Sequence, residues 1–250
     1  MAQKLVGITG GAGTIGQVLK RELDGEYKFR LLDRTGGEDI STVRFDDLEE
    51  VSGSLDGLDA VIHLAANPSP EGEWSSVLAD NIEATYLVTE ECRQAGVRRL
   101  IFASTNHTQH GNTMLTTPET LDPTRELLMR TEDPPNPDSL YAVSKLFGEN
   151  LGKYYSEQHG LEFVALRIGW IVPDDQPESK KGTRAEDYMR AMWLSHRDCG
   201  QVMRCALETP LSFFVAYATS DNSRRVFDLT RTRRVLGYSP QDNAESRFAD

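Results

Sequence analysis

A tyrosine and a lysine four residues apart, Tyr141 and Lys145, are suited to proton transfer. On a helix, positions i and i+4 lie on one face, so the two side chains would point the same way. An ammonium beside a phenol favours the phenolate and lowers its pKa from about 10 toward neutral pH. Such a tyrosine accepts a proton in an oxidation and returns it in a reduction. Taken alone, the pattern is common, and a buried tyrosine beside a surface lysine is its usual explanation.

A glycine-rich turn, Thr9-Gly10-Gly11-Ala12-Gly13-Thr14-Ile15-Gly16, follows an apolar run and opens a segment with helical spacing. Gly10 permits the tight turn, Gly13 lets the backbone approach a pyrophosphate, and Gly16 allows the helix to pack closely on the strand. The helix N-terminus then offers N–H groups and partial positive charge to the phosphates. The turn therefore predicts a dinucleotide site, built from Gly10, Gly13, Thr14, Ile15 and Gly16.

Asp33 lies about 20 residues beyond the turn, at the end of a second apolar run. A carboxylate at this position holds the ribose hydroxyls of NAD and repels the extra phosphate of NADP. NAD is therefore the predicted cofactor. Arg34 follows directly and offers a cation to that phosphate, so some use of NADP stays open.

The elements that must position these residues alternate along the first 170 residues. We expect strands over 4–9, 27–32, 60–65, 100–103 and 163–168, and helices over 15–23, 81–95 and 140–159. Continuous apolar strands separated by helices are typical of a parallel sheet covered on both faces. Such a sheet binds ligands beyond the carboxyl ends of its strands. Gly10, Asp33, Ala65, Thr105 and Ile168 would all reach that edge.

The fold predicted is α/β, a Rossmann-type doubly wound parallel sheet with a small C-terminal substrate cap. We expect a single NAD-binding domain over 1–250, in which 170–250 largely contribute the cap. Within that part, a helix through 206 capped by Ser195, a strand over 211–217 and a helix over 230–236 are expected. The polar, proline-containing stretch from His107 to Ser139 is either a substrate-facing lid or a surface loop without chemistry.

Composition excludes several classes of protein. The formal net charge of −12 disfavours nucleic acid and anionic lipid surfaces as partners. No apolar stretch approaches the roughly 20 residues of a membrane helix, and no signal region is visible, so we expect a cytoplasmic protein. The three scattered cysteines argue against a disulfide framework or a zinc site, and no metal is expected. Among the histidines, we expect His63 in the core and only His107 in the site.

The turn, Asp33, His63-Leu64-Ala65-Ala66, Ser104-Thr105-Asn106-His107 and the Tyr141/Lys145 pair occur in a diagnostic order. Together they resemble the extended, epimerase/dehydratase-like branch of the short-chain dehydrogenase/reductase superfamily, over nearly the whole chain. Further segments (167–169, 192–200 and 236–243) look most similar to two groups of sugar dehydrogenases. These are the NAD-dependent glucose-6-phosphate dehydrogenases of haloarchaeal type and the bacterial uronate dehydrogenases.

The resemblance implies a role for each matching position. Tyr141 would transfer the proton, Lys145 would tune it and hold the nicotinamide ribose, and Thr105 would hydrogen-bond the reacting oxygen. The other implied cofactor contacts are Asp47 and Leu48 at the adenine, Leu64, Ala65 and Ala66 along the cofactor path, Asn81 in support, and Ile168 near the nicotinamide.

On the substrate side, the resemblance implies contacts from Asn106 and His107. The arginine that binds the substrate anion in related enzymes has no match at the same offset. Arg190 and Arg184 are the nearest candidates, and Arg190 is the one we predict.

The implied reaction is oxidation of the anomeric hydroxyl of an anionic hexose to a lactone, with glucose 6-phosphate the first choice and a hexuronate the second. A nucleotide-sugar epimerase or dehydratase and a non-catalytic NAD-sensing protein are the alternatives. Because relatives often dimerise through the two long helices, 81–95 and 140–159 here, a homodimer is expected.

Overall fold

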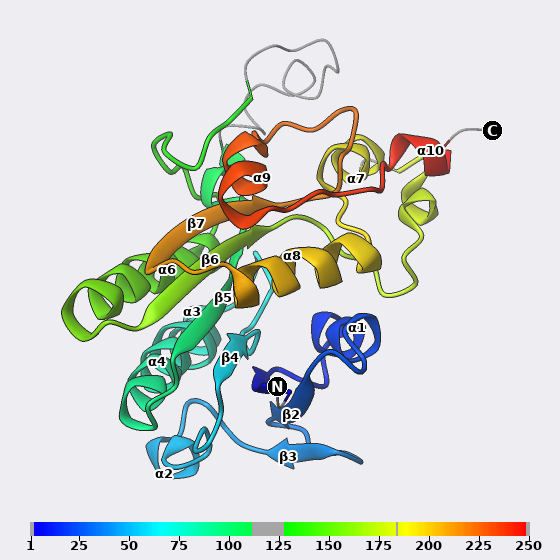
Figure 1. The fold of residues 1–250 in the computed structure, drawn as a ribbon. Coiled ribbons are helices and arrows are strands. Elements are labelled where there is room, and N and C mark those ends of the chain that lie inside the picture. Colours follow the sequence, from blue (N-terminus) through cyan, green and yellow to red (C-terminus); the bar gives the residue numbers. More distant parts are fainter. Residues whose placement is uncertain (1–2, 112–127, 184, 249–250) are drawn as a thin grey trace.

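The computed structural model describes residues 3–111, 128–183 and 185–248 of the chain, and its framework is one seven-stranded sheet (Figure 1). All neighbouring strands are parallel, in the order β3-β2-β1-β4-β5-β6-β7. The order reverses between β1 and β4, which creates a ligand-binding crevice at the carboxyl ends of these strands. The predicted Rossmann-type doubly wound fold is confirmed. The strands are β1 (Leu5–Thr9), β2 (Lys28–Asp33), β3 (Ile40–Thr42), β4 (Ala60–His63), β5 (Arg99–Thr105), β6 (Glu162–Ile168) and β7 (Phe213–Ala218).

Helices cover both faces of the sheet (Figure 1). One face carries α1 (Thr14–Glu22) and α8 (His196–Glu208). The other carries α2 (Leu48–Val51), α4 (Ala84–Gln94) and α6 (Leu140–His159). The remaining helices and turns are α3 (Trp74–Val77), the π-helix η1 (Leu78–Glu83), the 3₁₀ turns η2 (Asn106–Gln109) and η4 (Pro177–Lys180), α7 (Glu186–Met192), α9 (Thr230–Leu236) and α10 (Glu245–Phe248).

Strand β5 shows why the sheet needs cover on both sides. All seven of its residues are buried, and successive side chains enter opposite cores. Ile101 packs in the core under α1 and α8, whereas Leu100 and Phe102 pack in the core under α4 and α6. Full burial of each such side chain contributes about 1.5–3 kcal/mol, so these two cores hold the strand ends in fixed positions.

Part of 170–250, where we expected the C-terminal cap, belongs to the sheet and its covering layer. Strand β7 is the seventh strand of the sheet, and α8 packs beside α1 on its face. Both are therefore part of the main layers. The segment that leaves the sheet above the crevice runs from Trp170 through α7 to Trp193. The backbones of Trp170 and Trp193 pair at an isolated β-bridge, which closes this segment at its base.

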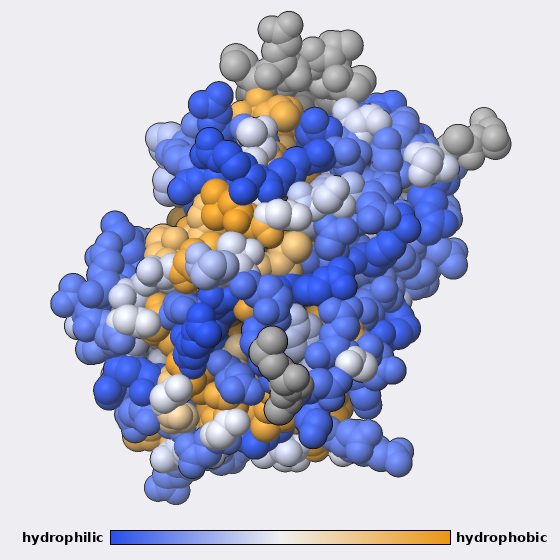
Figure 2. All heavy atoms as spheres, in the orientation of Figure 1, coloured by the Kyte–Doolittle hydropathy of each residue, from blue (hydrophilic) through white to orange (hydrophobic). Residues whose placement is uncertain are grey.

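The view in Figure 2 is mostly hydrophilic, with apolar side chains reaching the surface over β7. Phe213 and Val215 of this edge strand are only partly buried. Among the described residues, no helix is long and apolar enough to cross a membrane.

Candidate active site

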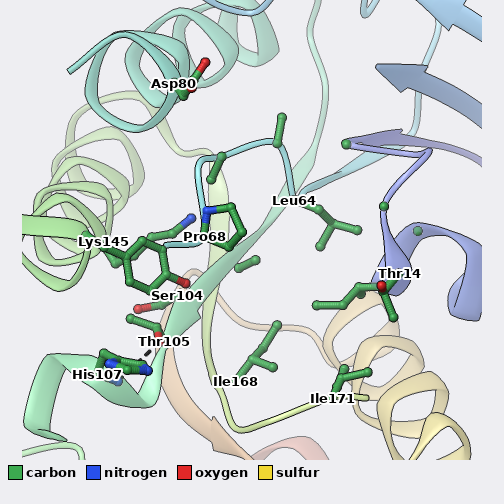
Figure 3. A pocket seen from close by; sticks show the side chains of 18 of the residues that line it. Thr14, Leu64, Pro68, Asp80, Ser104, Thr105, His107, Lys145, Ile168 and Ile171 are labelled. Atoms are coloured by element: carbon green, nitrogen blue, oxygen red, sulfur yellow. Dashed lines mark hydrogen bonds between the residues drawn. The ribbon is translucent and has the colours of Figure 1, made fainter. Parts of the chain in front are cut away.

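A cavity of about 1480 Å³ runs along the carboxyl ends of the central strands (Figure 3). It exceeds the roughly 300–1,000 Å³ of a usual small-ligand site, so it has room for a dinucleotide and a second small molecule. In Figure 3, Thr14 lies toward one end, and Lys145, Thr105 and His107 gather at the other. The predicted site residues on its wall are Gly10, Gly13, Thr14, Ile15, Gly16, Asp33, Arg34, Leu64, Ala65, Ala66, Thr105, Asn106, His107, Tyr141, Lys145 and Ile168.

The glycine turn has the geometry that a pyrophosphate needs. Gly10 has φ +70°, and a Cβ there would lie 2.8 Å from the backbone nitrogen of Ala65. Gly13 is the N-cap of α1 and has no side chain to satisfy the first N–H groups of that helix. Those groups are available to an anion in the cavity.

Asp33 is fixed at the rim beside the turn. One carboxylate oxygen accepts from the N–H of Ala12 at 3.1 Å, and the other accepts from the N–H and hydroxyl of Thr35 at 3.0 and 2.9 Å. The carboxylate is thus oriented before any ligand arrives. The crowded Gly10, the uncapped helix and this carboxylate fit a dinucleotide with free ribose hydroxyls.

At the end of the cavity where we expected Asp47 and Leu48 to border the adenine, the structure places their neighbours in the chain. Asp47 caps α2 by accepting from the N–H groups of Glu49 and Glu50, and Leu48 begins that helix with 66% of its surface exposed. Neither residue lines the cavity, whose wall here consists of Arg44, Phe45 and Asp46. The helix cap explains the difference, because it draws Asp47 toward the start of α2.

A buried polar chain supports the loop from Leu64 to Ala66. The Thr9 hydroxyl accepts from the N–H groups of Leu64 and Ala65, both at 3.2 Å, and lies 2.7 Å from Nδ1 of His63. Burial, with a smaller contribution from Lys145, lowers the pKa of His63 to about 3, so the imidazole is neutral. The prediction that His63 is a core residue is confirmed.

Tyr141, Lys145 and Thr105 meet at the end of β5. Ser139 caps α6 by accepting from the N–H of Ala142 at 3.2 Å, which places Tyr141 and Lys145 in the first turns of the helix. The Tyr141 hydroxyl is hydrogen-bonded with Thr105. The Lys145 ammonium lies 4.9 Å from the ring centroid of Phe102 and 5.8 Å from that of Tyr141.

The pKa of Tyr141 differs from the sequence-based expectation. Burial raises it, the hydrogen bond with Thr105 opposes this, and the charge of Asp138 adds to the increase. Burial also lowers the pKa of Lys145 to about 7. The apolar surroundings disfavour both charged forms, and this effect outweighs the attraction between ammonium and phenolate that the sequence pattern suggested.

Asn81 supports the site from outside the cavity. It lies in η1, where its Oδ1 accepts from the N–H of Asn67 at 2.7 Å and its Nδ2 donates to Ser144 at 3.0 Å. Asn81 was predicted to support the cofactor site, and the structure places it beside the cavity wall rather than on it. The side chain instead ties the loop beyond Ala66 to α6, and π-helical turns are frequent at such functional positions.

At the end of the cavity that holds Lys145 and Thr105, two histidines share one carboxylate. Nδ1 of His107 and Nδ1 of His110 lie 2.8 and 2.5 Å from the same Oδ2 of Asp138. His110 also lines the cavity, and we did not predict it. Its signal was the spacing of three residues from His107, which brings side chains into line on a 3₁₀ turn.

Arg190, the predicted anion-binding residue, does not line the cavity. Its guanidinium pairs with Glu186 at 2.7 Å and Glu245 at 2.5 Å, and it lies over the ring of Phe248. Arg184, the other candidate, falls outside the described residues. The face of α7 that lines the cavity instead carries Tyr188 and Met192, following Ala185 at intervals of three and four residues.

A second buried network lies behind Thr105 and Tyr141. Arg167 donates to both carboxylate oxygens of Glu149 at 2.9 Å and to Gln109 at 3.0 Å. Ser104 donates to the same carboxylate at 2.5 Å. These bonds join β5, β6, α6 and η2, and so fix Thr105 relative to Tyr141.

The comparisons with known proteins agree with this geometry. The model of the NAD dependent epimerase/dehydratase family matches residues 6–203. The chain belongs to this family. NAD is the cofactor of the family, as the turn and Asp33 predicted.

Members of the epimerase/dehydratase family similar to this chain include two from Haloferax volcanii. An L-arabinose 1-dehydrogenase (NAD(P)(+)) is 41% identical over 96% of this chain and 97% of its own. An NAD-dependent glucose-6-phosphate dehydrogenase is 36% identical over 95% of this chain and 93% of its own. A uronate dehydrogenase variant from Agrobacterium tumefaciens, solved in complex with NAD, is 28% identical with a TM-score of 0.81 over 98% of this chain and 87% of its own. These relatives confirm the predicted enzyme class, an NAD-dependent oxidoreductase acting on CH–OH groups.

Proposed function

We propose that the chain oxidises the anomeric hydroxyl of an aldose to a lactone, with NAD as the acceptor. The observation that carries this proposal is the position of the Tyr141–Thr105 pair, which shares one cavity with the phosphate-binding turn. The names of the relatives support the sugar, because they include dehydrogenases for L-arabinose and glucose 6-phosphate.

In this reaction the C–H and O–H bonds at the anomeric carbon break and a C=O bond forms. NAD, held by the turn and Asp33, supplies the acceptor for the hydride. Thr105 orients the hydroxyl and Tyr141, as phenolate, takes its proton. Lys145 lies on the same face of α6 and stabilises that phenolate when the ammonium is charged. Asn106 and His107 hold the other hydroxyls of the sugar.

The wall of the sugar end favours a neutral aldose. Apart from Lys145, its described residues include no lysine or arginine, since the cavity's two arginines, Arg34 and Arg44, lie at the adenine end. The resemblance placed glucose 6-phosphate first, and an anionic substrate calls for a basic partner, but Arg190, the candidate for that role, pairs with Glu186 and Glu245. A free pentose or hexose is therefore our first candidate. An anionic hexose, glucose 6-phosphate or a hexuronate, is the second, supported by the relative that is 36% identical.

The test is NADH formation with L-arabinose, D-glucose, glucose 6-phosphate and glucuronate, with NADP run in parallel. We expect higher kcat/KM for a neutral sugar than for either anion. A preference for an anion would overturn the choice of substrate but keep the reaction. No net NADH from any aldose would overturn the reaction, since an epimerase regenerates its cofactor and an NAD-sensing protein has no turnover.

We also propose a homodimer through the faces of α4 and α6, which pack side by side (Figure 1). Their outer surfaces expose apolar side chains, among them Tyr86 at 46%, Val143 at 48% and Tyr154 at 54%. Exposed apolar groups on adjacent helices are typical of association sites. Light scattering should give twice the chain mass, and Val143→Asp should return it to the monomer; a wild-type monomer contradicts the proposal.

A further inference from the structure

Asp138 connects the sugar end of the cavity to the helix that carries the proton-transfer residue. Its Oδ2 lies 2.8 Å from Nδ1 of His107 and 2.5 Å from Nδ1 of His110. Its Oδ1 accepts from the hydroxyl of Ser139 at 2.8 Å, and Ser139 is the N-cap of α6. One carboxylate thus joins two imidazoles of the cavity wall to the first turn that holds Tyr141.

This arrangement decides which ring nitrogen of each histidine carries a proton. An ionised carboxylate only accepts hydrogen bonds, so both Nδ1 atoms must be donors. In a neutral imidazole the other nitrogen, Nε2, then has a lone pair and accepts. For His107 that nitrogen is on the side of the ring away from Asp138, and the ring lines the cavity with its centroid 5.9 Å from that of Tyr141.

Hydrogen bonds to the carboxylate keep it ionised. Burial raises its pKa, but hydrogen bonds from His110, Ser139 and His107 outweigh this and hold the pKa below its ordinary value. Burial, with the neighbouring His107, lowers the pKa of His110 to about 4, so this histidine does not neutralise the carboxylate at neutral pH.

We propose that Asp138 is a positioning residue that fixes His107 as a hydrogen-bond acceptor for a sugar hydroxyl next to Tyr141. The inference rests on the proposed sugar oxidation. A fixed acceptor binds a group that brings a proton, and it repels a phosphate or carboxylate oxygen. Asp138 therefore selects for substrates that present a hydroxyl at this point of the cavity.

A second effect follows from the charge of Asp138 itself. The groups facing Tyr141 are Lys145 on its own helix, Thr105 at the end of β5, and His107 on η2. His110 lies behind His107 and contacts Tyr188 of α7. The negative carboxylate beside this group disfavours a second negative charge on the phenol. Its removal should allow Tyr141 to ionise at lower pH.

The experiment compares Asp138→Asn with the wild type and with Asp133→Asn, a control in the same segment whose side chain accepts from a backbone N–H outside the cavity. For Asp138→Asn we expect the sugar KM to rise about tenfold and the NAD KM to stay within twofold. The ascending limb of the kcat–pH profile should move to lower pH. The control should change none of the three.

His107→Gln separates positioning from folding. If Asp138 acts through His107, adding Asp138→Asn to His107→Gln changes the sugar KM by less than twofold, while the shift of the pH limb remains. Equal effects of Asp138→Asn in both backgrounds overturn the inference. So do an unchanged sugar KM and pH profile in the single variant. If Asp138→Asn does not fold, Asp138→Ser and Asp138→Glu replace it. The inference is supported if the sugar KM rises more than fivefold in the serine variant and the glutamate variant reverses at least half of that rise. A wild-type sugar KM in the serine variant overturns the inference. Failure of the proposed function is distinct, because the wild type would then form no NADH from any aldose.

Discussion

The ammonium of Lys145 lies 4.9 Å from the ring centroid of Phe102, and in the described structure it has no hydrogen-bond or carboxylate partner. A buried charge without a partner costs stability, and the lowered pKa of about 7 expresses that cost. If Lys145 serves the proposed reaction rather than the fold, the protein should become more stable without it.

Lys145→Met should raise the free energy of unfolding by about 1–3 kcal/mol and abolish turnover. The folded pKa is depressed below the unfolded value, so the destabilisation by lysine is complete below pH 7 and disappears between pH 7 and 10.5. Urea unfolding of variant and wild type at pH 6, 8 and 10 checks the sign. Lys153→Met, on the exposed face of the same helix, should change stability by less than about 0.5 kcal/mol. A destabilised Lys145→Met would contradict this account.

Tyr141→Phe should lower kcat by about 10²–10⁴-fold, because the ring stays in place while the proton acceptor is lost. NAD affinity should be unchanged, which fluorescence titration measures. Tyr154→Phe is the matched control, since this tyrosine lies on the outer face of α6. Near-normal turnover of Tyr141→Phe would show that another group takes the proton.

Alanine substitutions at two glycines of the turn should affect different properties, stability at Gly16 and NAD binding at Gly13. A Cβ at Gly16 would lie 2.6 Å from the carbonyl oxygen of Gly11, so Gly16→Ala should lower Tm by several degrees. At Gly13 the nearest atom is 3.3 Å away, and the new methyl group would face the cavity. Gly13→Ala should therefore keep its Tm within about 2 °C and weaken NAD binding about tenfold. Equal losses of Tm would refute the distinction.

Two buried histidines should make the protein sensitive to acid. The pKa of His63 is lowered to about 3 and that of His110 to about 4, in both cases chiefly by burial. Below pH 6.5 the unfolded chain binds protons that the folded chain refuses, so stability falls by roughly 1.4 kcal/mol per pH unit for each histidine. His63→Gln should remove one such slope between pH 6 and 4, measured by urea unfolding. An identical slope in the variant would exclude His63 as the cause.

The sequence predicted well wherever a pattern was long and local. The limits of α6, Leu140–His159, matched because Ser139 and Gly160 cap it with recognisable residues. The residues at strand ends also converged as expected, since one parallel sheet aligns all carboxyl ends.

Most of the contacts that the sequence did not reveal join residues far apart in the chain. Nothing in the local sequence shows that the guanidinium of Arg190 donates a hydrogen bond to Glu245, 55 residues away. The local sequence also does not show that Asp47 caps α2, or that Asn81 donates to Ser144 across 63 residues. Strand β3, with three residues, is too short for any periodicity to be visible.

The ladder between β5 and β6 pairs Thr105 with Ile168, so the hydroxyl proposed to bind the substrate and the side chain expected at the nicotinamide are positioned by backbone bonds of a rigid sheet. The wall of the proposed sugar site comes instead from α7 and η2, which touch each other where Asn106 donates to the sulfur of Met192 at 2.8 Å. Mutations can therefore alter substrate choice without altering the positions of Thr105 and Ile168. A few substitutions on one short helix and one turn could change which sugar is accepted, while the residues proposed for hydride and proton transfer stay the same.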